Sequence, residues 1–174
     1  TVGTFPSKDK CPWVKLAVFG DKRSSSGSLR TNDNVKAVWG LEGDYDAHAV
    51  TMEQAAAMLE QYGIRAALYP SPSNTADRPR WRVICPLSNA HTPEQRHNLV
   101  ARLNQALGGI LAKESFTLSQ GYFFGAVPAN QYRVMATEGV CIDQVPEWML
   151  AAPSTQVISL PASGGANKLD VTLE

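Results

Sequence analysis

Short apolar segments recur along the chain between polar stretches rich in glycine, proline and serine, and their length is typical of β-strands. Four of these segments each predict a strand: WVKLAVFG (13–20), NVKAVWGLEGDYD (34–46), IRAALYPS (64–71) and RWRVICPL (80–87). A later pair indicates a hairpin that leads to VCID (140–143): GYFFGAV (121–127) and QYRVMAT (131–137).

Two helices are predicted by apolar residues at helical spacing together with capping signals. The first follows Thr51, which forms a capping-box pattern with Gln54, and its apolar stripe ends at Gly63. The second follows Thr92, has proline at its first position and ends at the glycine pair 108–109. Each helix therefore connects one pair of strands to the next.

The order of these elements, β-β-α-β-β-α-β-β, predicts an α+β fold in which helices pack on a mixed sheet. A chain of 174 residues is long enough for one domain built from two small lobes around a cleft. From residue 151 onward the periodicity is lost, and proline, serine and glycine become frequent. We expect residues 1–150 to form the domain and residues 151–174 to be a linker or tail.

The composition is typical of a soluble globular protein. No apolar run approaches the roughly 20 residues that span a bilayer, and no basic-then-apolar leader opens the chain. The three cysteines, Cys11, Cys85 and Cys141, lie far apart, which suits a reducing cytoplasm and disfavours a disulfide scaffold or a zinc site. The net formal charge is zero, so only local basic patches could hold phosphates. We expect a cytoplasmic protein with no membrane partner.

Four groups that bind protons or metals stand at every second position near the end of the second predicted strand: Glu42, Asp44, Asp46 and His48. Side chains at this spacing share one strand face about 7 Å apart, so the carboxylates repel each other unless a cation lies between them. Asp44 and Asp46 suit a divalent metal that takes oxygen ligands and keeps positions open for phosphates. A partner arginine and plain solvent are the alternatives, and His48 is either a third ligand or a surface residue.

Arginines cluster at the fourth predicted strand. Arg80 and Arg82 share one strand face, where two rigid guanidinium forks suit a planar or tetrahedral anion. The alternative is that these two arginines neutralise nearby carboxylates, with Asp44 and Asp46 as the partners. Arg78, in the preceding turn, reaches either the same anion or solvent.

A polar loop with an SSSGS stretch follows the first strand, and we call residues 22–30 the basic loop. It carries three basic residues, Lys22, Arg23 and Arg30. The loop lacks the spacing of a P-loop and of a dinucleotide fingerprint. It is either a flexible connector or a contact for nucleic-acid phosphates.

In this order the motifs resemble the archaeo-eukaryotic primase superfamily, specifically the primase-polymerase domains of plasmids, phages and mobile elements. Asp44-Tyr45-Asp46 matches the family's Asp-hydrophobic-Asp/Glu motif, which ends a strand. YPSPSNTADRPRWRVICPLS (69–88) resembles the second, nucleotide-binding region, and ESFTLSQGYFFG (114–125) resembles the stretch that follows it. The resemblance covers about residues 12–145.

The resemblance implies an RRM-like catalytic module in one two-lobed domain, with Asp44 and Asp46 as the ligands of Mg²⁺ or Mn²⁺. It assigns Arg80 and Arg82 to the nucleotide phosphates, because the family's Ser-x-His is absent. Two further residues are nucleotide-binding candidates: Arg78 and Ser73. The contacts to DNA are expected from the basic loop.

The family's third motif, a hydrophobic residue followed by aspartate, is expected soon after the second helix, where this chain has Ala112. Asp143 in VCID has the right local form and is our candidate for the third catalytic carboxylate. Glu114 is the other candidate.

The sequence therefore predicts the DNA primase-polymerase domain of a mobile-element replication protein, which transfers nucleotides from nucleoside triphosphates onto a primer paired with a DNA template. The family often joins this domain through a linker to a helicase. The alternative is a catalytically inactive, nucleic-acid-binding replication-initiator domain with the same fold. The alanine at position 112 favours the alternative, whereas the aspartate pair opposes it.

Overall fold

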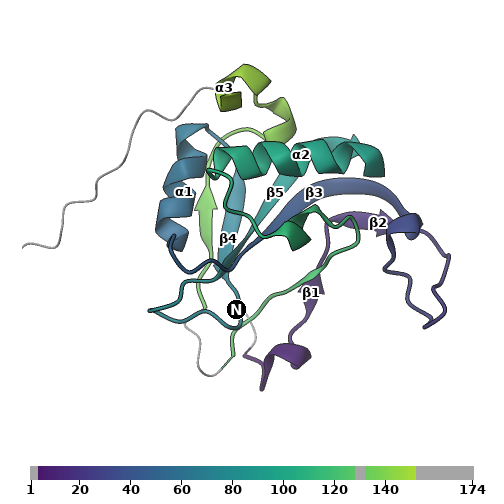
Figure 1. Ribbon diagram of the computed structural model, residues 1–174. Coiled ribbons are helices and arrows are strands. Elements are labelled where there is room, and N and C mark those ends of the chain that lie inside the picture. Colours follow the sequence, from purple (N-terminus) through teal and green to yellow (C-terminus); the bar gives the residue numbers. More distant parts are fainter. Residues whose placement is uncertain (1–3, 128–131, 152–174) are drawn as a thin grey trace, which may run out of the picture.

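The computed structural model describes residues 4–127 and 132–151, and a five-stranded sheet lies at its centre (Figure 1). The strands follow the order β2-β3-β5-β4-β7. Their bounds are β2 (Ala17–Phe19), β3 (Val35–Tyr45), β4 (Ala66–Pro70), β5 (Trp81–His91) and β7 (Met135–Thr137). Helices α1 (Met52–Gln61) and α2 (Pro93–Ala106) cover one face of this sheet. The predicted α+β class is confirmed.

A second, two-stranded sheet lies against the face that carries no helix. It pairs β1 (Trp13–Val14) with β6 (Tyr122–Phe123). The remaining elements are short: η1 (Lys8–Lys10), η2 (Asn32–Asn34), η3 (Lys113–Phe116), η4 (Ile142–Gln144) and α3 (Glu147–Ala151). None of the helices in the described ranges is long and apolar enough to cross a membrane.

The core lies between the main sheet and the two long helices. Four fully buried residues illustrate it: Leu41 of β3, Val83 of β5, Leu59 of α1 and Leu103 of α2. Alternation along the strands sends these side chains toward the helices and sends their neighbours to the opposite face. This opposite face carries the acidic and basic residues discussed below.

The two helices begin where the capping signals predict. Thr51 Oγ1 accepts a hydrogen bond from Gln54 N at 3.2 Å, and the Gln54 side chain accepts one from Thr51 N at 2.8 Å. At α2 the Gln95 side chain accepts from Thr92 N at 2.9 Å. These reciprocal bonds satisfy amide groups that a helix start leaves without partners.

Two strand predictions differ from the structure. The first predicted strand, 13–20, breaks into β1 and β2 because the intervening residues turn toward a buried carboxylate of β3. The hairpin prediction is wrong, since β6 pairs with β1 whereas β7 pairs with β4, in a different sheet. After these strands, Ile142 and Asp143 of VCID lie in the 3₁₀ helix η4, and Asp143 is held by the side chains of Ser88 and His91 of β5.

The strands pair almost entirely in the antiparallel direction, whereas a mixed sheet was expected. Every ladder between the strands named above is antiparallel. Parallel pairing occurs only at two isolated bridges within the described ranges, Thr4 with Ala126 and Ile64 with Val140. The predicted linker, 151–174, lies outside the described residues except for Ala151.

Candidate functional site

Asp44 and Arg82 face each other across the β3–β5 ladder, on the sheet face that carries no helix. Arg82 Nε donates to Asp44 Oδ1 at 2.9 Å. Arg82 Nη1 also donates to the carbonyl oxygen of Phe123, and the guanidinium lies 5.2 Å from the centre of the Tyr122 ring. The Arg82 side chain is 8% exposed and that of Asp44 is 20% exposed. β6 therefore covers Arg82 and leaves Asp44 partly open.

A second ion pair lies where the two strands end. Arg80 Nη2 is 3.2 Å from Asp46 Oδ2, and both side chains are considerably more open, at 34% and 48% exposed. Asp46 follows β3 directly, and Arg80 directly precedes β5. The alternative that the two arginines neutralise the two aspartates therefore agrees with the geometry.

The strand ends are fixed from the helix side by two aromatic residues. Tyr45 and Trp81 stack with ring centres 4.7 Å apart, and the Tyr45 hydroxyl accepts from Ala49 N and Val50 N, each at 2.7 Å. Trp81 Nε1 donates to the Val50 carbonyl oxygen at 2.9 Å. Within this turn His48 adopts φ 64°, which side chains rarely adopt, so the predicted row of alternating residues ends before it. Its Nε2 atom is buried without a hydrogen-bond partner.

Glu42 belongs to a separate, fully buried cluster. Its Oε2 atom lies 2.7 Å from Lys15 Nζ and 3.0 Å from Arg96 Nη2, and its Oε1 atom accepts from Leu16 N. Burial lowers the pKa of Lys15 to about 8, although attraction to Glu42 opposes the shift. Because the cluster is closed to solvent, Glu42 anchors the N-terminal segment and α2 to β3 and is not open to a ligand.

Sequence reasoning missed both partners of Glu42, although a signal for each is present. Lys15 interrupts the apolar run 13–20. Arg96 stands three and four positions before Leu99 and Val100, on the buried stripe of α2. A charged residue in an apolar row indicates a buried ion pair, because an unpaired charge there is strongly unfavourable.

The segment after α2 runs along β3 beside Asp44. Ala112 N donates to the Asp44 carbonyl oxygen at 2.8 Å, and Asp44 N donates to Ser115 Oγ at 3.0 Å. Residue 112 therefore lies next to the aspartate pair, where the resemblance leads us to expect a third carboxylate. Glu114 is exposed on η3 of the same segment.

Asp143 lies at the other end of β5. It accepts from Ser88 N at 3.0 Å and from Ser88 Oγ at 2.5 Å, and it lies 3.0 Å from His91 Nε2. Although burial opposes it, these hydrogen bonds hold the pKa of Asp143 below its usual value. Ser88 is six residues from Arg82, which is about 20 Å along a strand. Asp143 therefore ties η4 to β5, and the structure does not bring it to the aspartate pair.

The loop between β4 and β5 carries the other two nucleotide-binding candidates. Ser73 and Arg78 are both exposed in it. The loop is held to Arg80, whose N–H donates to Asn74 Oδ1 at 2.8 Å and whose carbonyl oxygen accepts from Ser71 N at 2.9 Å. The loop therefore sets the position of Arg80 and presents Ser73 and Arg78 to solvent.

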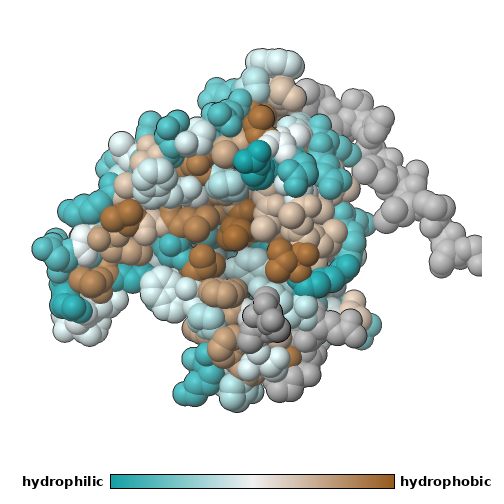
Figure 2. Space-filling view, turned by 180° about the vertical axis from the view of Figure 1, so that it is seen from behind, coloured by the Kyte–Doolittle hydropathy of each residue, from teal (hydrophilic) through white to brown (hydrophobic). Residues whose placement is uncertain are grey.

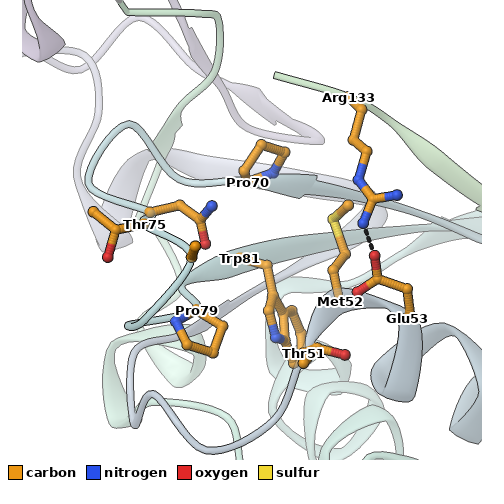
Figure 3. Close-up of a pocket in the computed structure, with 10 residues that line it drawn as sticks. Thr51, Met52, Glu53, Pro70, Thr75, Pro79, Trp81 and Arg133 are labelled. Atoms are coloured by element: carbon orange, nitrogen blue, oxygen red, sulfur yellow. Dashed lines mark ion pairs between the residues drawn. The ribbon is translucent and has the colours of Figure 1, made fainter. Parts of the chain in front are cut away.

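A pocket opens on the helix side of this loop (Figure 3). It is lined by Thr51, Met52, Glu53, Pro70, Asn74, Thr75, Ala76, Pro79, Trp81 and Arg133. Arg133 forms an ion pair with Glu53 at one side, and Thr75 and Pro79 lie at the other. Because the Trp81 side chain points away from the face that holds the two aspartates, this pocket is separate from them.

The basic loop is organised around the buried side chain of Asn34. Its Oδ1 atom accepts from Lys22 N at 3.1 Å, and its Nδ2 atom donates to the Leu29 carbonyl oxygen at 2.7 Å. The side chains of Lys22, Arg23 and Arg30 are exposed. The loop therefore has a fixed base and presents its charges to solvent.

The chemistry of the aspartate pair fits a divalent metal that arrives with a triphosphate. In the described contacts each aspartate gives one oxygen to its arginine, which leaves the other oxygen for a cation. Mg²⁺ is commonly held by one or two carboxylates together with substrate phosphates and water. Residues 4–127 and 132–151 contain no group of three or more His, Cys, Asp and Glu side chains that could hold a metal. A site built from protein ligands alone does not fit.

Comparison with known proteins supports the fold. No family model matches the sequence, and no curated protein does either. Among solved structures, the chain is similar to the AEP domain (PP-N190) of the cyanophage S-2L primase-polymerase (PrimPol), with a TM-score of 0.53 and 12% identity. The similarity covers 76% of this chain and 68% of that one. The chain thus has a fold like that of an archaeo-eukaryotic primase domain, as the resemblance implies.

Proposed function

We propose that this chain is the primase-polymerase domain of a replication protein, and that it transfers nucleotides from nucleoside triphosphates onto a primer paired with a DNA template. The observation that carries the proposal is the pairing of two aspartates with two arginines at the ends of adjacent strands. Ligands for a divalent metal and donors for a triphosphate thus lie within one hydrogen bond of each other. The similarity to a primase-polymerase domain supports the same proposal.

Asp44 and Asp46 would hold Mg²⁺ or Mn²⁺, which would neutralise charge on the triphosphate and lower the pKa of the attacking hydroxyl. Arg80 is one third exposed, so its guanidinium can turn from Asp46 to a phosphate and donate two parallel charge-assisted hydrogen bonds. Arg82 is held by Asp44, β6 and the Tyr122 ring, so its part is to orient Asp44. We assign contacts with template or primer phosphates to the basic loop.

A second candidate function is nucleic-acid binding without catalysis. Ala112 favours it, because residue 112 borders Asp44 and contributes no carboxylate. The two candidates make the same prediction for DNA binding and different predictions for nucleotide transfer.

Primer extension and primer synthesis with Mn²⁺ test the proposal on the wild-type chain and on Asp44→Asn/Asp46→Asn. We expect the double variant to lose both activities by orders of magnitude while single-stranded DNA binding is largely kept. Asp143→Asn is the matched control, because it removes a carboxylate at the far end of β5 and should keep extension below its melting temperature. Extension by the double variant at the wild-type rate would refute the proposal, and a wild-type chain that binds DNA without extending it would establish the second candidate.

A further inference from the structure

Two large aromatic side chains are exposed near the basic loop. Trp13 of β1 is 51% exposed and Trp39 of β3 is 54% exposed. Val18 of β2 is also half exposed. Single exposed apolar residues are ordinary, whereas several on neighbouring strands indicate a surface that another molecule covers. Figure 2 shows hydrophobic residues in a band across the molecule seen from behind, between hydrophilic residues above and below.

Trp13 is held in place by its neighbours. The Arg30 guanidinium lies 5.3 Å from the centre of the Trp13 ring, and Arg30 Nη1 donates to the Ser119 carbonyl oxygen at 3.3 Å. The ring also packs on Gly121, where a Cβ atom would come within 2.9 Å of Trp13 Cε3. A fixed indole beside a fixed guanidinium provides two planar groups on which a base can stack.

Trp39 lies beside the segment that follows Trp13, since Trp39 N donates to the Leu16 carbonyl oxygen at 2.8 Å. Val18 pairs with Ala37, and Trp39 stands two residues further along β3, so these three side chains share one face. Val38 between them is fully buried in the core with the helices. Trp39 therefore faces away from Val38, on the side of the exposed Val18, and it precedes Asp44 by five residues on the same strand.

The charge of this surface favours an anionic partner. The basic loop contributes Lys22, Arg23 and Arg30, and Lys36 of β3 is exposed beside it. Two exposed acidic residues, Asp21 and Asp33, stand in the same stretch, so basic residues exceed acidic ones by two. A second copy of this chain would bring the same positive charge against itself, which disfavours self-association here.

We propose that Trp13, Arg30 and Trp39 form a stacking platform for a single nucleic-acid strand that leads toward Asp44. Sequence-tolerant binding of single strands combines aromatic side chains, on which bases stack, with basic groups along the backbone. The proposal rests on the part of the proposed function that concerns DNA, and it is independent of the chemistry at the two aspartates.

Fluorescence anisotropy of a labelled 20-nucleotide oligo(dT), measured at several salt concentrations, tests the platform. We expect Trp13→Ala and Trp39→Ala each to weaken binding about tenfold, with the salt dependence unchanged, because stacking releases no counterions. Neutralising Lys22, Arg23 and Arg30 together should weaken binding and also reduce the slope against log salt, by up to about two. Trp148→Ala is the matched control, since Trp148 is 74% exposed on α3, away from β1 (Figure 1), and should bind as the wild type does.

Several outcomes would overturn the platform. Wild-type affinity in both tryptophan variants would do so, and so would an equal loss in Trp148→Ala. If Trp13→Ala fails to fold, Trp39→Ala decides alone. A change of oligomeric state without a change in oligo(dT) affinity would assign the surface to a second copy instead. Failure of the proposed function would look different. In that case Asp44→Asn/Asp46→Asn would still extend primers, and the tryptophan variants would still bind oligo(dT) more weakly than the wild type.

Discussion

Replacing Asp44 by asparagine should destabilise the protein, whereas the same change at Asp46 should be nearly neutral. Each substitution keeps the shape of the side chain and removes the negative charge that faces an arginine. Arg82 would remain covered by β6 with a carbonyl oxygen and the Tyr122 ring as its other contacts. Arg80 would simply turn toward solvent, because its pair with Asp46 is open.

The magnitudes follow from the exposure of each pair. Removing one partner of a buried ion pair costs about 3–5 kcal/mol, because the remaining charge is left without compensation. Asp44 is partly exposed, and asparagine can still accept a hydrogen bond from Arg82 Nε, so we expect about 1.5–3 kcal/mol for Asp44→Asn. An exposed pair such as Asp46 with Arg80 contributes about 0–1 kcal/mol.

For a chain of this size each kcal/mol corresponds to roughly 2–4 °C in Tm. Thermal unfolding in metal-free buffer should therefore show a fall of about 3–12 °C for Asp44→Asn and at most about 4 °C for Asp46→Asn. Raising the salt concentration should abolish the Asp46 effect and leave most of the Asp44 effect, since salt screens exposed charges far more than buried ones.

A double variant separates the ion pair from other causes. Asp44→Asn/Arg82→Met removes both charges, so it should be more stable than the sum of the two single effects predicts. The reasoning is refuted if Asp44→Asn unfolds at the wild-type temperature or above. That result is what the sequence alone suggests, because two unpaired carboxylates repel each other and their removal relieves strain.

Three further predictions follow from other contacts. Arg80→Ala should weaken binding of a non-hydrolysable nucleoside triphosphate about tenfold or more in titration calorimetry, with Tm changed little. Arg65→Ala, an exposed arginine just before β4, is the control, and equal affinities in wild type and Arg80→Ala would contradict the assignment. The pKa of Lys15 is about 8 in the folded protein and is expected near its ordinary value of 10.5 in the unfolded chain. Between these pH values the unfolded chain binds more protons than the folded protein, so the contribution of Lys15 to stability rises with pH. In urea unfolding at pH 8 to 10, the free energy of unfolding of the wild type should rise with pH by up to about 1.4 kcal/mol per pH unit more than that of Lys15→Met. If the two proteins show the same dependence on pH, the lowered pKa of Lys15 is contradicted. Ala112→Asp should tighten Mn²⁺ binding measured by electron paramagnetic resonance, since it adds a carboxylate beside Asp44, and unchanged binding would place the metal elsewhere.

Local sequence signals predicted the elements well where the cause is itself local. The capping boxes at Thr51 and Thr92 fixed both helix starts, because each involves residues three apart. The strands β3 and β5 were predicted from their apolar runs, and Asp44 and Arg82 were both candidates. Their facing positions depend on the register between the two strands, which the sequence left open.

The predictions that failed depend on contacts between distant segments. β6 and β7 were expected to pair with each other because they are neighbours in the chain, yet each finds a partner far away, β1 and β4. The break between β1 and β2 depends on Glu42, which is 27 residues from Lys15. Asp143 was assigned from its local motif alone, and its three donors on Ser88 and His91 place it away from Asp44.

From the sequence, either a metal or a partner arginine could neutralise the two aspartates. The proposed function uses the arginines in the free protein and a metal once the nucleotide binds. The two ion pairs differ in how readily they exchange partners, because the pair of Asp46 with Arg80 is open to water and the pair of Asp44 with Arg82 is mostly covered. Opening the covered pair would leave a buried guanidinium without its carboxylate, which is the more unfavourable step. When a metal and a triphosphate bind, the ion pair between Asp46 and Arg80 should therefore break, so that Asp46 contacts the metal and Arg80 contacts the triphosphate. Arg82 should keep its hydrogen bond to one oxygen of Asp44, and the second oxygen is then available to the metal. On this argument Arg80 and Arg82 have different parts although they share a strand face, so the triphosphate titration should respond to Arg80→Ala and the unfolding temperature to Asp44→Asn.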